Sequence, residues 1–149
     1  MKIAIGADHR GYKLKEKIKN YLNEKNIEVI DCGTDSEERT DYPKIVANVA
    51  KMVQKHEAEQ GILICGTGFG MCITANKYRG IRSAPCYNVE TAKFAKLHNN
   101  TNVLAIGADQ TDEEDALKIV EIWLETKFEG GRHEERLRMI EEIEKENMK

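Results

Sequence analysis

A cysteine stands where an apolar run of the sequence changes into a glycine-rich segment. Residues 61–64 are short enough for a buried strand, Cys65 follows, and Gly66, Gly68 and Gly70 then occupy every second position. Glycines let a ligand approach backbone amides closely, and amides at the start of a helix favour negative charge. A thiolate at Cys65 would be a competent nucleophile or base. The segment predicts a catalytic cysteine beside an anion site, and a tight turn with an inert, buried cysteine is the structural alternative.

Two glycine-containing segments approach the patterns of nucleotide-binding loops without matching them. Residues 6–11 have the G-x-x-x-x-G frame of a P-loop, but Tyr12 and Lys13 stand where a Lys-Ser/Thr pair must bind phosphate and magnesium. Residues 66–71 differ from the dinucleotide pattern G-x-G-x-x-G because Met71 occupies the third glycine position. ATP and NAD are therefore disfavoured as ligands, and no cofactor is expected.

Polar side chains elsewhere could complete such a site. Asp8 and His9 follow the first predicted strand at its carboxyl end, where open parallel sheets bind ligands, so we expect them to face the same crevice as Cys65. An Asp cap and a surface histidine are the simpler interpretation of this pair. His98 and Asn99 end a predicted helix, where a C-terminal cap is the more frequent role.

Two arginines near the C-terminus have the spacing of a helix face. Arg132 and Arg136 are four residues apart, so on a helix they point to the same side. Two guanidinium groups introduced by Gly130 and Gly131 could bind a phosphate. Considered alone, a solvent-exposed helix face is the favoured interpretation because surface charges contribute little.

The cysteines and histidines lack the spacing of a metal site. No C-x-x-C pair is present, and three cysteines are interpreted as small buried apolar residues: Cys32, Cys72 and Cys86. Neither H-x-x-x-H nor H-E-x-x-H occurs among His9, His56, His98 and His133. The sequence therefore predicts no metal site.

Length and composition limit the class of protein. A chain of 149 residues with 40% hydrophobic residues is expected to form one globular domain, residues 1–149. The net charge of −3 provides no overall attraction for nucleic acid. The first six residues already look like a strand, so no signal peptide is expected, and no apolar run is long enough to span a membrane. A reducing cytoplasm is the expected location.

Apolar runs alternate with segments of helical periodicity along the chain. Leu14, Ile18 and Leu22 recur at helical spacing, for example, and Pro43 suits the first turn of a helix. Strands and helices that alternate with short loops predict a parallel sheet with helices on both faces. The expected strands are about 3–6, 28–32, 62–65, 81–84 and 103–107, and the expected helices are about 12–25, 41–56, 72–77, 89–97, 111–126 and 133–146.

The last predicted helix, about 133–146, follows after the sheet is complete. Leu137, Ile140 and Ile143 form a narrow apolar stripe on a very polar helix. Packing against another subunit and packing against its own domain are equally favoured interpretations.

Taken together, these residues resemble the ribose-5-phosphate isomerase B family, which also includes allose- and galactose-6-phosphate isomerases. No single motif is specific, but their order and spacing together are. The matching segments are 6–11, 41–43, 65–71 with 75–77, 98–99 with 102–104, and 128–133.

The resemblance implies a three-layer α/β/α Rossmann-like fold and a homodimer whose active sites use both subunits, and we expect the last helix to lie at the interface. It implies a metal-free aldose–ketose isomerase that interconverts ribose 5-phosphate and ribulose 5-phosphate through an enediolate. Cys65 would move the proton, His98 would assist ring opening, and Asp8 and Thr67 would handle hydroxyl protons. The implied binding residues are His9, Arg132 and Arg136 for the phosphate, Asn99 for the sugar, Tyr42 in the pocket wall, and the amides of Gly66, Gly68, Phe69 and Gly70 for the enediolate.

The sequence departs from the family pattern at three positions, and no function is attached to one of them, Pro85. Met71 stands where some members carry an acidic base, so this chain is of the cysteine type. Asp109 stands where many relatives carry an arginine that approaches the phosphate, which puts that contact in doubt. Two alternatives remain open, namely an isomerase that prefers a six-carbon sugar phosphate and a non-catalytic module that binds a phosphosugar.

Overall fold

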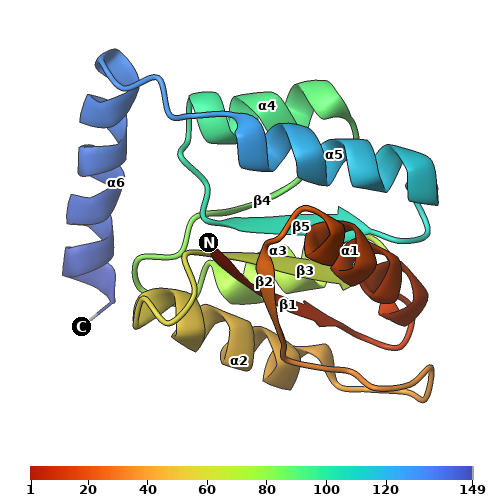
Figure 1. Cartoon of the computed structure of the whole chain (residues 1–149). Coiled ribbons are helices and arrows are strands. Elements are labelled where there is room, and N and C mark those ends of the chain that lie inside the picture. Colours follow the sequence, from red (N-terminus) through yellow and green to blue (C-terminus); the bar gives the residue numbers. More distant parts are fainter. Residues whose placement is uncertain (149) are drawn as a thin grey trace.

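The structure is a computed structural model that describes residues 1–148, and it shows one sheet between two layers of helices (Figure 1). The strands are β1 (Lys2–Ala7), β2 (Glu28–Asp31), β3 (Gln60–Cys65), β4 (Ser83–Pro85) and β5 (Val103–Gly107). The helices are α1 (Tyr12–Glu24), α2 (Tyr42–Gln54), α3 (Phe69–Ala75), α4 (Val89–Leu97), α5 (Glu113–Glu125) and α6 (Arg132–Asn147). All strand pairs are parallel, which confirms the predicted α/β/α architecture with a five-stranded parallel sheet.

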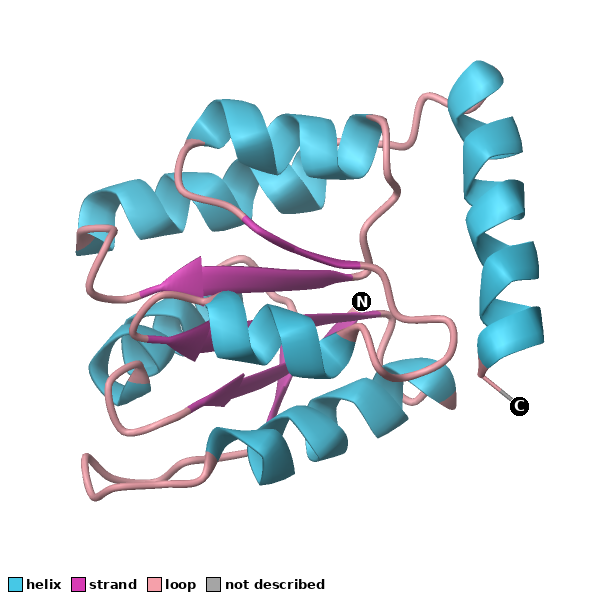
Figure 2. Cartoon of the chain, turned by 180° about the vertical axis from the view of Figure 1, so that it is seen from behind, coloured by secondary structure: helices cyan, strands magenta, loops and turns pink. Residues whose placement is uncertain are grey.

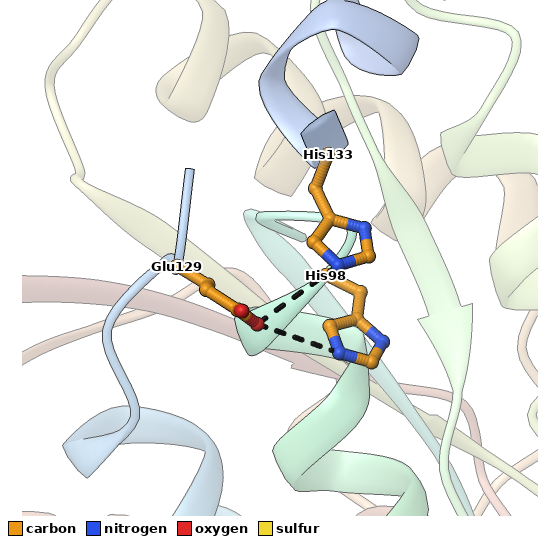
Figure 3. A group of neighbouring side chains, drawn as sticks. All are labelled: His98, Glu129 and His133. Carbon is orange, nitrogen blue, oxygen red and sulfur yellow. Dashed lines mark ion pairs between the residues drawn. The ribbon is translucent and has the colours of Figure 1, made fainter. Parts of the chain in front are cut away.

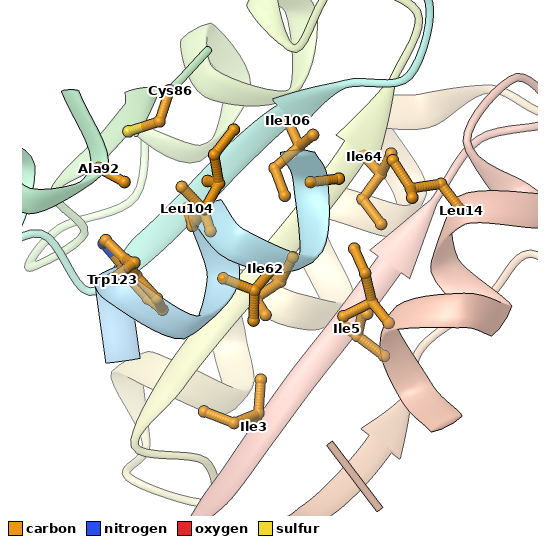
Figure 4. Close-up of a cluster of buried hydrophobic side chains, with 14 of the residues drawn as sticks. Ile3, Ile5, Leu14, Ile62, Ile64, Cys86, Ala92, Leu104, Ile106 and Trp123 are labelled. Carbon is orange, nitrogen blue, oxygen red and sulfur yellow. The ribbon is translucent and has the colours of Figure 1, made fainter. Parts of the chain in front are cut away.

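The alternation of side chains along each strand divides the core between the two faces of the sheet. In β3, Ile62 and Ile64 pack with α1, α4 and α5, whereas Leu63 and Cys65 pack with α2 and α3. Trp123 of α5 lies wholly buried over the first face (Figure 4). Burial of a large apolar side chain contributes about 1.5–3 kcal/mol, so both helical layers are held to the sheet mainly by these contacts.

The order of the strands, β2-β1-β3-β5-β4, creates a switch point between β1 and β3. The chain leaves β1 toward β2 on one side and leaves β3 toward β4 on the other. The loops that follow these two strands therefore separate at the carboxyl edge of the sheet and leave a crevice, where α/β proteins bind their ligands. The loop that begins after Cys65 lies at this point.

Two helix starts differ from the sequence prediction by more than one residue. The helix after the glycine segment begins at Phe69, three residues earlier than expected, because Gly68 adopts the left-handed conformation (φ 86°) and ends the loop. The loop between β3 and α3 is therefore only three residues long. At α5 the N-cap is Asp112 rather than Thr111, and its carboxylate accepts the amide N–H of Asp115 at 2.8 Å.

The last helix, α6, stands apart from both layers, beside the ends at which the strands begin (Figure 1). Seen from behind, the arrowheads of the strands point away from it (Figure 2). A groove of about 470 Å³ separates α6 from the start of β4, and a hydrogen bond of 2.8 Å joins the amide of Gly80 to the carboxylate of Glu144. Leu137 is 9% exposed, but Ile140 and Ile143 are 50% and 59% exposed, so α6 covers its own domain only in part.

Within residues 1–148, no helix combines the length and the apolar content needed to cross a membrane.

Candidate active site

Cys65 is the last residue of β3, and its thiol is held by the loop that follows. The side chain lies on the face covered by α2 and α3, and the residue is 6% exposed. The amide of Gly68 donates a hydrogen bond of 3.1 Å to Sγ of Cys65. The amide of Phe69 donates to the hydroxyl of Thr67, also at 3.1 Å. Two backbone donors at the turn into α3 thus orient a thiol and a hydroxyl, which is a competent arrangement for proton transfer.

Asp8 and His9 lie on the adjacent loop, as expected from their place after β1. The amide of Asp8 donates to the carbonyl of Ile64 at 3.1 Å, which joins the two loops directly. The carboxylate oxygen Oδ1 of Asp8 accepts the amides of Arg10 and Gly11 at 3.0 and 3.1 Å. Asp8 therefore does serve as a cap of its own turn, which is the simpler interpretation that the sequence left open, and it is also 7% exposed at the crevice.

The segment before α2 brings two more predicted residues to the same edge. The amide of Thr40 donates to Nδ1 of His9 at 3.3 Å. Tyr42, the first residue of α2, lies so close to the glycine loop that a Cβ on Gly70 would be 2.7 Å from its ring. Gly70 is therefore required for the contact with Tyr42. The structure thus gathers Asp8, His9 and Tyr42 around residues 65–70.

An ion pair that the sequence did not indicate lies against Gly66. Nε of Arg10 donates to the carboxylate of Asp109 at 2.6 Å, across the carboxyl ends of β1, β3 and β5. A Cβ on Gly66 would lie 2.8 Å from that carboxylate and 3.0 Å from Nε of Arg10. Asp109 stands where many relatives carry a phosphate-binding arginine, and in this chain its carboxylate binds the guanidinium of Arg10. The pairing could not be predicted because the sequence does not specify which strands are neighbours.

Tyr87 is a second residue that sequence reasoning missed. Its hydroxyl donates to the carbonyl of Thr67 at 3.4 Å, and its ring packs edge-on against Phe69 with centroids 6.1 Å apart. Burial, together with the nearby thiols of Cys72, Cys65 and Cys86, raises the pKa of Tyr87. Tyr87 therefore stays a neutral hydrogen-bond donor that covers the glycine loop.

The other three cysteines are held as neutral thiols by their surroundings. Burial raises the pKa of Cys32 to about 11 and that of Cys86 to about 12, and it also raises the pKa of Cys72. These thiols stay protonated at neutral pH. Their interpretation as structural residues agrees with these environments.

The remaining predicted site residues lie at the opposite edge of the sheet. His98 is the C-cap of α4 and Asn99 follows it, while Arg132 and Arg136 belong to the first turns of α6. α4 returns the chain from the carboxyl edge to the amino edge, as do all crossovers of a parallel sheet. A strand of five residues such as β5 is about 16 Å long, so one chain does not bring these four residues to its own glycine loop.

Two ionisable residues lie close to His98 at this edge: Glu129 in the linker before α6 and His133 in the first turn of α6 (Figure 3). A carboxylate oxygen of Glu129 lies 3.6 Å from Nε2 of His98 and 3.9 Å from Nε2 of His133. The two imidazole rings are stacked, with centroids 4.2 Å apart and an interplanar angle of 13°. Short-range spacing could not indicate this group, because His98 is far from the other two residues in the sequence.

An α/β fold with a thiol, a carboxylate and backbone donors at its switch point is typical of enzymes for small ligands. Comparison with known proteins identifies the family. A family model described as Ribose/Galactose Isomerase matches residues 3–140. Ribose-5-phosphate isomerase B of Escherichia coli (strain K12) is 49% identical over 143 residues, which cover 96% of this chain and 96% of that protein.

Solved structures agree with this result. Ribose-5-phosphate isomerase B of Clostridium thermocellum has a TM-score of 0.97 and 47% identity, covering 98% of this chain and 99% of that one. The Mycoplasma genitalium enzyme of the same name, with bound ribulose-5-phosphate, has a TM-score of 0.95 and 39% identity, covering 98% and 97%. The chain belongs to the ribose/galactose isomerase family and is an aldose–ketose isomerase. The alternative of a non-catalytic phosphosugar-binding module is therefore set aside.

Proposed function

We propose that this enzyme interconverts D-ribose 5-phosphate and D-ribulose 5-phosphate, with Cys65 as the base. The observation that carries the proposal is the thiol of Cys65 at the switch point, with the amide of Gly68 3.1 Å from its sulfur. The similarity to ribose-5-phosphate isomerases B supports a five-carbon substrate over the six-carbon alternative.

The proposed reaction moves one proton between two carbons. The Cys65 thiolate removes the proton from C2 of the open-chain aldose, an enediolate forms, and the same proton is returned to C1. Asp8 and Thr67 are assigned to the accompanying transfer between the hydroxyl oxygens. Tyr42 lines the pocket.

The backbone amides of Gly66, Gly68, Phe69 and Gly70 are assigned to the enediolate. In the structure the amides of Gly68 and Phe69 bond to the side chains of Cys65 and Thr67, so in this assignment they exchange these partners for the enediolate when substrate binds. The next amides, at the start of α3, have no acceptor within the helix. Loss of one such donor typically costs about 2.7–4 kcal/mol of transition-state stabilisation.

A second copy of the chain supplies the remaining groups in this proposal. His98 opens the sugar ring, Asn99 binds the sugar, and Arg132 and Arg136 bind the phosphate together with His9 of the first copy. Two features support a homodimer: the distance of about one strand length between the two groups of residues, and an exposed apolar face on α6. Met139, Ile140 and Ile143 of that face are 64%, 50% and 59% exposed.

The proposed location is the cytoplasm. The four cysteines are free thiols, three of them buried, and thiols persist in the reducing cytoplasm.

The test is replacement of Cys65 by alanine. We expect kcat for ribose 5-phosphate to fall by about 10²–10⁴-fold, because general acid–base catalysis contributes that much, while folding and binding of the sugar phosphate persist. Cys32→Ala is the matched control and should retain activity. Full activity of the Cys65→Ala enzyme would contradict its role as base.

The substrate assignment needs a separate measurement. Comparison of kcat/KM for ribose 5-phosphate and allose 6-phosphate decides between five and six carbons, and a higher value for allose 6-phosphate would overturn the assignment.

A further inference from the structure

His98, Glu129 and His133 bring three potential metal ligands together at the amino edge of the sheet (Figure 3). Each contributes one ligand atom, and these three atoms lie within 4.8 Å of one another. In a tetrahedral zinc site with bonds of about 2.0–2.1 Å, neighbouring ligand atoms are roughly 3.3 Å apart. The two imidazole rings are stacked at an interplanar angle of 13°, so one ring must turn out of the stack before both Nε2 lone pairs point to a common ion.

The backbone holds the three residues in this arrangement. The amide of Glu129 donates to the carbonyl of Leu97 at 3.0 Å, which fixes the linker before α6 against the end of α4. His98 donates its own amide to Phe94 at 2.9 Å, and His133 donates to Gly130 at 3.2 Å. Since the ligand-bearing segments are already tied together, an ion would not have to order them.

The chemistry of the ligand atoms selects the class of ion. Imidazole nitrogen suits zinc, cobalt, nickel and copper, whereas magnesium and calcium prefer sites made of oxygen. Two imidazoles and one carboxylate, with a fourth position left for water or substrate, are a common zinc ligand set. We propose that His98, Glu129 and His133 form a binding site for a zinc-type divalent ion.

Nearby charges act on such an ion in opposite directions. The carboxylate of Glu129 attracts it, while the positive charges of Arg132, next to His133 in the sequence, and of Arg136, one turn further along α6, repel it. These arginines weaken metal binding and favour an anion. The site should therefore bind a divalent ion with moderate affinity. Binding of a cation here opposes the binding of phosphate by the neighbouring arginines of α6.

Occupation of the site has a consequence for catalysis. Coordination through Nε2 removes the lone pair that His98 needs to accept a proton, so the bound ion should inhibit the isomerase reversibly. This consequence rests on the proposed role of His98 in ring opening, whereas the metal site itself does not.

The experiment measures metal binding without turnover. Chelator-treated wild-type enzyme is titrated with Co²⁺, which reports its ligands through its visible spectrum, and with Zn²⁺ in a calorimeter. We expect one ion per chain and no thiolate-to-cobalt charge-transfer band. Even outer-shell partners of a metal contribute about 10–100-fold to affinity, so Glu129→Gln and His133→Ala should each weaken binding by more than about 100-fold. Arg132→Ala should strengthen it.

Two results would overturn the proposal. One is equal affinity of the wild-type enzyme and the Glu129→Gln/His133→Ala double variant, and the other is a thiolate band that places the ion on cysteine. Glu129 is 54% exposed in its side chain, so its replacement by the isosteric glutamine leaves folding intact.

Activity measurements then separate the two proposals. Zn²⁺ should inhibit the wild-type enzyme, and a chelator should restore its isomerase activity. The Glu129→Gln/His133→Ala double variant should not be inhibited by Zn²⁺. Binding at this site without inhibition would leave the metal site standing and contradict the role of His98 in ring opening.

Discussion

The carboxyl edge and the amino edge of the sheet hold their candidate residues in different ways. At the carboxyl edge, Cys65 and Asp8 are 6% and 7% exposed, and backbone amides of the same chain bind their side chains. At the amino edge, Arg132 and Arg136 are exposed on a helix that stands apart from the sheet (Figure 1). Contacts within one chain fix the side chains at the carboxyl edge. The arginines at the amino edge point to solvent and are free to contact another molecule.

This difference follows from the topology of parallel sheets. Every crossover helix returns the chain to the amino edge, so residues that end helices and residues that end strands are separated by the length of a strand. Residues that lie where a crossover helix ends, such as His98, can serve a carboxyl-edge site only when another chain brings them there. Variants that separate the two groups of residues, or recombine them, test this division.

Complementation between two inactive variants tests the division directly. A Cys65→Ala chain retains the arginines, and an Arg132→Ala/Arg136→Ala chain retains the cysteine. When the two are mixed at equal amounts and allowed to exchange subunits, half of the dimers are heterodimers with one complete site each, so about a quarter of the wild-type activity should appear. The measurement is isomerase activity before and after exchange at low substrate concentration. If each site lay within one chain, mixing would restore nothing.

Arg136→Ala tests the amino-edge group alone. A hydrogen bond to a charged group contributes about 1.5–3 kcal/mol, so KM for ribose 5-phosphate should rise roughly 10–100-fold with a smaller change in kcat. Arg138→Ala is the matched control, since Arg138 lies on the same helix and binds Glu134 at 3.1 Å. It should change KM little because exposed ion pairs contribute at most about 1 kcal/mol. An unchanged KM in Arg136→Ala would remove Arg136 from the phosphate site.

The fold could be predicted from the sequence because its signals are local. Helical periodicity, apolar runs and residues such as Pro43 fix elements one at a time, and alternation of strands and helices implies parallel pairing. Element ends were less predictable. Gly68 has the same residue type as Gly66 and Gly70, and only its left-handed conformation shows that α3 begins at Phe69.

The candidate site was predictable where its residues follow strands and unpredictable where it depends on neighbours in space. Cys65 and Asp8 could be found because they stand after apolar runs. The pair Arg10–Asp109 and the ring of Tyr87 could not be found, because they depend on the strand order β1-β3-β5 and on side-chain packing. The group around His98 likewise depends on how the linker before α6 folds back.

Lys96 anchors the end of α4 that carries His98, and its burial predicts a pH effect. The residue is 6% exposed, Nζ donates to the carbonyl of Trp123 at 3.0 Å, and burial lowers its pKa to about 8. The unfolded chain keeps this proton up to about pH 10.4. Between these values the unfolded state binds more protons than the folded one, so this group makes the free energy of unfolding rise with pH.

The measurement compares Lys96→Met with the wild-type enzyme. From pH 8 to pH 10 the wild-type free energy of unfolding should rise relative to the variant by at most about 3 kcal/mol. The indole ring of Trp123, 4.1 Å from Nζ, favours the charged amine and reduces this value. Lys93→Met, at an exposed position of the same helix, is the control and should follow the wild type. Parallel curves for Lys96→Met and the wild type would contradict the lowered pKa.

The smallest effect is expected at the carboxyl edge, for the ion pair that lies against Gly66. Arg10 and Asp109 are 57% and 39% exposed in their side chains, so the pair should contribute about 0.2–1 kcal/mol. Because it spans the loops after β1 and β5, Asp109→Ala should release Arg10 and lower kcat/KM by roughly 1.4- to 5-fold. Arg10→Ala should have the same effect, and the double variant should be no worse than either, as expected for residues that act as a unit.

If the effects of Arg10→Ala and Asp109→Ala on kcat/KM add up in the double variant, the two side chains act independently of each other. A larger rise of KM in Arg10→Ala than in Asp109→Ala would have a different meaning. It would show that Arg10 itself binds the substrate and that Asp109 only positions it, so the carboxyl edge would carry part of the phosphate binding now assigned to the arginines of α6.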